Sequence, residues 1–74
     1  MAFRSGAFPD STNLDLYTFD DETKELVITF QTGRRYAYSG VPVAVVTALL
    51  EAESAGKFFA ANIRNTYSYT RLEG

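Results

Sequence analysis

The chain has 74 residues, no cysteine, no histidine and a formal net charge of −2. This length allows one domain, and the missing residue types exclude disulfides, thiolate or imidazole metal sites and the commonest general bases. A hydrophobic content of 46%, with six Phe and five Tyr, excludes a disordered chain. Charge is uneven: residues 1–31 carry a net −4 and residues 32–74 a net +2, so the second half can present a basic surface.

Residues 1–10 show no apolar periodicity and include Gly6 and Pro9. We therefore expect a flexible N-terminal arm there, followed by a single domain over residues 11–71. The first residues lack the apolar core of a secretory signal, and no apolar stretch approaches the roughly 20 residues of a membrane span. A cytoplasmic protein without membrane contact is expected.

Three segments of alternating apolar and polar residues follow, at residues 13–19, 25–31 and 34–39. This period predicts strands, and the turn-forming residues between the segments predict an antiparallel meander. In the first strand, Leu14 and Leu16 should share one face, with Tyr17 and Phe19 on the other.

The period changes after Pro42, which suits the first turn of a helix. Residues 43–53 predict a helix in which Val46, Leu49 and Leu50 form the buried stripe. Ser54 is a candidate N-cap for a second, shorter helix.

That second helix should span residues 55–62 and direct Phe58, Phe59 and Ile63 toward the core. Alternation at residues 67–71 predicts a short final strand or an extended tail. The expected fold class is α+β, a three-stranded antiparallel β-meander followed by two helices packed on one face.

The order of these signals resembles the KTSC domain, a family named after the C-terminal extension of some lysyl-tRNA synthetases. The resemblance covers residues 11–71 and departs at Phe19, where the family more usually has Tyr, and in the N-terminal arm. It rests on Phe19-Asp20, Leu26 to Phe30, Gly33-Arg34, Tyr36-Ala37-Tyr38, Val41-Pro42, Ser54 to Phe59, Ile63-Arg64 and Tyr67-Ser68-Tyr69.

Members of this family are short, and many are free-standing bacterial or phage proteins. The resemblance carries no established activity. It implies RNA binding only by analogy with the synthetase linkage.

Catalysis is not expected, because no His or Cys can act as base or nucleophile. The acidic run Asp20-Asp21-Glu22 falls in a predicted turn and lacks the D-x-D-x-D-G pattern of a calcium loop. The glycines are too scattered for a phosphate-binding loop. No catalytic residue, metal site or cofactor is therefore predicted.

The distinctive feature is a cluster of aromatic and basic residues around the third predicted strand. Bases can stack on aromatic rings of an exposed sheet face, and nearby Arg side chains can contact phosphate. The alternative is structural, with Tyr36 and Tyr38 packed beneath the helices. The candidate nucleic-acid-binding residues are Arg34, Arg35, Tyr36, Tyr38, Lys57, Arg64 and Tyr67.

Two functions remain open from the residues alone. One is a non-enzymatic module that binds RNA, either tRNA or a single strand. The other is a protein-interaction or self-association module that uses exposed apolar surface or sheet edges. The positions of five cations distinguish the two functions. If they share one surface, RNA binding is favoured, and if they are spread over the molecule, a protein partner is favoured. These cations are Arg34, Arg35, Lys57, Arg64 and Arg71.

Overall fold

A computed structural model describes residues 3–9 and 11–72 of the chain. Within these residues the elements are β1 (Phe3–Ala7), β2 (Leu14–Asp20), β3 (Glu25–Phe30), β4 (Arg35–Tyr38), α1 (Val43–Glu51), α2 (Ala55–Asn62) and β5 (Tyr69–Leu72).

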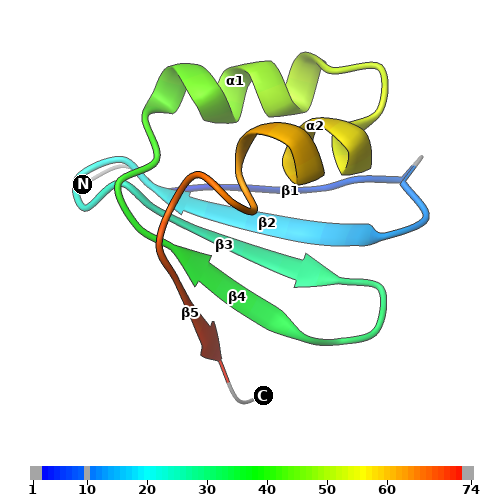
Figure 1. Ribbon diagram of the computed structural model, residues 1–74, viewed down its shortest axis with the longest axis horizontal. Helices are drawn as coiled ribbons and strands as arrows, with labels where there is room; N and C mark the ends of the chain where they lie inside the picture. Colours follow the sequence, from blue (N-terminus) through cyan, green and yellow to red (C-terminus); the bar gives the residue numbers. More distant parts are fainter. Residues whose placement is uncertain (1–2, 10, 73–74) are drawn as a thin grey trace.

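The described strands form one antiparallel sheet in the order β1-β2-β3-β4-β5, so each strand lies beside its neighbours in sequence. Both helices belong to the connection from β4 to β5, and they cover the same face of the sheet (Figure 1). The α+β class is confirmed. The prediction of three strands before the helices is wrong, because four precede them.

The additional strand is β1, which lies in the segment expected as a flexible arm and pairs along its length with β2. Its sequence has no alternation because Gly6 occupies an inward position. A Cβ at Gly6 would lie 2.9 Å from Cε1 of Tyr17, so the missing side chain makes room for this ring. Tyr17 also packs against Phe8 with ring centroids 5.5 Å apart. Residues 1, 2 and 10 of the expected arm lie outside the described residues.

A β-bulge corrects the predicted faces of β2. The pairing with β3 shifts register between Leu14 and Leu16, and an extra residue in a strand reverses the alternation beyond it. Leu14, Tyr17 and Phe19 are consequently all buried beneath the helices, whereas Leu16 is 45% exposed on the opposite face.

The core lies between the inward face of the sheet and the two helices. In α1, Val46 and Leu49 are buried as expected, but Leu50 is 43% exposed. The helix ends at Glu51, two residues earlier than predicted. Neither described helix is long and apolar enough to cross a membrane.

The second helix begins and ends where the sequence predicts. The Ser54 hydroxyl accepts a hydrogen bond from the Lys57 amide at 3.3 Å, which confirms the N-cap. Phe59 and Ile63 are buried, and Phe58 packs half-buried against the core.

After α2 the chain returns to the sheet as β5, which pairs with β4 over its whole length. The predicted final strand is therefore present, at Tyr69–Leu72. Its pairing places Tyr69 beside Tyr38 on the helix-bearing face.

We expect Gly6→Ala to lower the free energy of unfolding by about 1–3 kcal/mol, because the new methyl group displaces the Tyr17 ring. Urea unfolding measures this change. The control Ser5→Ala, on the outward face of the same strand, should change stability by less than about 0.5 kcal/mol. Equal stability of Gly6→Ala and the unsubstituted protein would contradict the close packing of this ring on β1.

Candidate nucleic-acid interface

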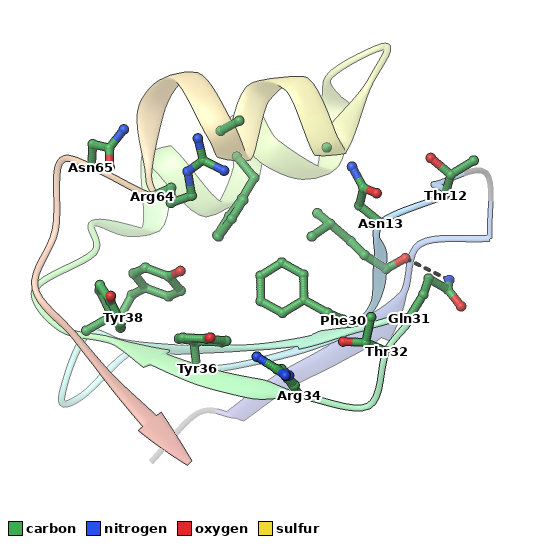
Figure 2. A pocket seen from close by; sticks show the side chains of 15 residues that line it. Thr12, Asn13, Phe30, Gln31, Thr32, Arg34, Tyr36, Tyr38, Arg64 and Asn65 are labelled. Atoms are coloured by element: carbon green, nitrogen blue, oxygen red, sulfur yellow. Dashed lines mark hydrogen bonds between the residues drawn. The ribbon is translucent and has the colours of Figure 1, made fainter. Parts of the chain in front are cut away.

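A cleft of about 760 Å³ opens between α2 and the helix-bearing face of the sheet (Figure 2). Its aromatic lining residues are Phe30, Tyr36, Tyr38, Phe59 and Tyr69; its basic ones are Arg34 and Arg64; its polar ones are Thr12, Asn13, Gln31, Thr32 and Asn65; Leu14, Gly56 and Ala60 complete it. We call this the aromatic cleft.

The five rings of the aromatic cleft are in mutual contact. The Tyr69 ring centroid lies 5.4 Å from that of Tyr36 and 5.5 Å from that of Tyr38. Phe30 meets Tyr36 edge-on at 5.5 Å, and Phe59 meets Tyr38 edge-on at 5.3 Å. These separations are those at which aromatic pairs attract one another, so the rings form a fixed surface.

The two tyrosines of β4 point toward the helices. Tyr36 is paired with Ile28 and Tyr38 with Leu26, both of which are fully buried. Tyr38 is itself buried, at 2% exposure, whereas Tyr36 is half-buried. Both rings therefore point beneath the helices, as the alternative to base stacking predicted. Both nevertheless line the opening of the cleft.

The most accessible ring of the cleft lies at the edge of the sheet. Tyr69 is on β5, which ends the strand order of the described sheet, and it is 54% exposed. Tyr36 and Tyr38, one strand further in, are half-buried and buried. Accessibility of the rings therefore increases toward this edge.

The two arginines stand on different walls of the aromatic cleft. Arg34 follows the turn residue Gly33, which has φ +91°, and lies on the sheet side; Arg64 follows α2 and lies on the helix side (Figure 2). Both are exposed. No Asp or Glu is among the described residues that line the cleft, so its lining carries positive charge.

The pKa of the Tyr38 hydroxyl is raised from 10.0 to about 12. Burial is the largest cause, the neighbouring phenols of Tyr69 and Tyr36 add to it, and Arg64 opposes it. At neutral pH this phenol is a hydrogen-bond donor inside the cleft.

The polar end of the aromatic cleft is tied to the β1–β2 connection. The Gln31 side-chain amide donates to the carbonyl oxygens of Leu14 at 3.1 Å and Ser11 at 3.5 Å. The Gln31 backbone N–H donates to the carbonyl oxygen of Asn13 at 2.8 Å. These bonds hold Asn13 at the rim. Nothing local in the sequence predicts this contact between segments about twenty residues apart.

Four of the seven candidate residues meet in the aromatic cleft, namely Arg34, Tyr36, Tyr38 and Arg64. The other three lie elsewhere. Arg35 is exposed on the opposite face of the sheet, Lys57 lines a second hollow of about 640 Å³ that also contains Glu53, and Tyr67 packs half-buried against the core.

The five cations therefore do not all converge. Arg34 and Arg64 line the cleft, and Arg71, paired with Tyr36, is on the same face of the sheet. Arg35 and Lys57 lie elsewhere. Sequence reasoning missed Phe30, Phe59 and Tyr69 as site residues. The alternation of Tyr67 and Tyr69 predicted a strand, but it did not predict that Tyr69 would contact Tyr36 and Tyr38. In the described part of the chain, no three acidic residues gather as a metal site would require.

Comparison with known proteins assigns the family. The family model of the KTSC domain matches residues 10–67. The chain belongs to the KTSC domain family. An uncharacterized protein of Stutzerimonas stutzeri is 38% identical over 64 residues, covering 85% of this chain and 90% of that protein.

Other KTSC-containing relatives are much longer. A lysine–tRNA ligase of Nostoc and one of Trichormus variabilis are each 30% identical over 64 residues, which is 86% of this chain but 11% of either ligase. The crystal structure of a KTSC domain protein from Yersinia pestis superposes with a TM-score of 0.89 at 24% identity, covering 97% of this chain and 100% of that one. At that identity the likeness concerns the fold.

We expect the ultraviolet titration of the tyrosines to contain a late phase near pH 12 that Tyr38→Phe removes. The unfolded chain releases this proton near pH 10 and the folded one near 12. The folded state therefore loses the contribution of Tyr38 as the pH rises through this interval. Tyr38→Phe should lose less stability from pH 10 to 12 in urea unfolding; an identical loss in both proteins would contradict the buried phenol.

Proposed function

We propose that this KTSC domain is a non-enzymatic module that binds single-stranded RNA in the aromatic cleft. The observation that carries the proposal is the combination of five rings and two arginines in one opening whose described lining has no carboxylate. Stacking of bases on aromatic rings combined with cationic contacts to phosphate is the common mode of single-strand recognition.

Each part of the cleft has a distinct role in this proposal. Tyr69 and Tyr36 present the most accessible ring faces, so they stack the bases. Arg34 and Arg64, on opposite walls, contact the backbone phosphates of a strand that passes between them. The neutral Tyr38 hydroxyl and the Asn13 side chain offer hydrogen bonds to base edges or to a ribose 2′-hydroxyl.

The cleft volume limits the ligand to a few nucleotides. About 760 Å³ lies within the range of small-ligand sites, so affinity is expected to be modest and strongly salt-dependent. RNA is favoured over other anions because two relatives that contain a similar segment are lysine–tRNA ligases. Binding without chemistry fits a chain that has no His and no Cys.

Removing either cleft arginine should weaken binding. In fluorescence anisotropy with a short single-stranded RNA at low salt, Arg34→Gln and Arg64→Gln should each reduce the slope of log affinity against log salt by about 0.7. The matched control is Arg35→Gln, because Arg35 is adjacent in sequence but faces away from the cleft. Equal losses for Arg34→Gln and Arg35→Gln would reject the cleft as the site.

Removing the exposed ring of Tyr69 should cost about 1–3 kcal/mol of binding, which is roughly 5- to 160-fold in affinity. Tyr69→Phe keeps the ring and should retain most of the affinity, whereas Thr70→Ala tests whether any change in β5 has the same effect. Urea unfolding confirms that each variant is folded. RNA affinity unchanged in folded Tyr69→Ala would argue against stacking in this cleft.

A further inference from the structure

The face of the sheet opposite the helices carries no described helix (Figure 1). Among the described residues in strand pairs, those that point outward are apolar, Ser or Thr, apart from Asp20, Glu25 and Arg35. Phe3 is 62% exposed there and Leu16 is 45% exposed.

The centre of this outward face carries short side chains. Its middle row across the sheet is Ser5, Thr18, Val27, Ala37 and Thr70, all small or β-branched. Short side chains allow a second sheet to approach to about 10 Å, as in β-sandwiches.

The charges of the outward face lie at two ends of the strands, with the acidic pair at one end and the cation toward the other. Asp20 and Glu25 are paired directly on β2 and β3, an arrangement in which like charges repel. Arg35 lies toward the opposite end of the strands, paired with Thr29. One Asp20 carboxylate oxygen accepts from the Glu22 amide at 2.9 Å.

We propose that two copies of the chain associate through this outward face, with Arg35 of each copy against Asp20 and Glu25 of the other. The contact is isologous, because one self-complementary patch serves both copies. The arginines relieve the repulsion within each acidic pair, while the exposed rings and methyl groups of Phe3 and Leu16 leave water. This association does not depend on RNA binding.

The size of the face sets the expected strength. Five strands about 4.8 Å apart, each five residues long at about 3.3 Å per residue, offer roughly 400 Å² per copy. Two such faces total about 800 Å², below the roughly 1,200–2,000 Å² of stable specific interfaces, so we expect a weak dimer that dissociates on dilution. The aromatic clefts then face away from the contact, and a longer RNA could engage both of them.

Sedimentation equilibrium of the full chain over a wide concentration range tests the proposal. The unsubstituted protein should approach twice the chain mass of 8.2 kDa at high concentration. Arg35→Glu and Glu25→Arg should each weaken association at least about tenfold, because like charges then face each other. The double variant Arg35→Glu/Glu25→Arg restores opposite charges and should recover the dimer.

A matched pair of exposed leucines provides the apolar test. Leu16→Lys, on the outward face, should abolish association, whereas Leu50→Lys, at similar exposure on α1, should leave it unchanged. A monomer at every concentration would overturn the proposal, as would a double charge variant that stays monomeric although folded. Equal effects of the two leucine variants would also overturn it.

Discussion

The packing of Phe59 onto the sheet determines both the core and the aromatic cleft. This ring is 3% exposed and meets Phe30 edge-on at 5.5 Å and Tyr38 edge-on at 5.3 Å. It thereby fixes α2 over β3 and β4, the strands from which those two rings come. Tyr69, on the edge strand β5, stays 54% exposed. The rings beyond Phe59 border an opening rather than a closed core.

This arrangement explains how the same tyrosines can be structural and available to a ligand. Tyr38 is held in the core at one side and lines the cleft at the other, and its burial raises its pKa to about 12. Tyr36 is half-buried and Tyr69 is more than half exposed, so accessibility increases from β4 toward the edge of the sheet. The ring surface is held by contacts on several sides before any ligand arrives, which lowers the ordering cost of binding.

Local patterns in the sequence predict much of this fold, and non-local contacts determine the rest. Alternation predicted β2, β3 and β4, and Ser54 correctly marked the start of α2. The strand β1 was missed because it is held by pairing with β2 and by a ring that lies over a glycine, neither of which leaves an apolar alternation. The bulge after Leu14 reversed the predicted faces of β2 for a similar reason. Of the site, sequence predicted Tyr36, Tyr38, Arg34 and Arg64, but which cations share a face depends on topology.

The aromatic cleft lies on one face of the sheet, and the surface proposed for self-association lies on the other. Binding of single-stranded RNA in the cleft is the central claim, and an amide chemical-shift titration tests it directly, with tRNA and a short single-stranded RNA as ligands at low salt. We predict progressive shifts at Arg34, Tyr36, Arg64 and Tyr69, with the amide of Arg35 changing little beyond what its neighbours impose. An unmoved spectrum with both ligands, or shifts confined to the outward face, would contradict the claim.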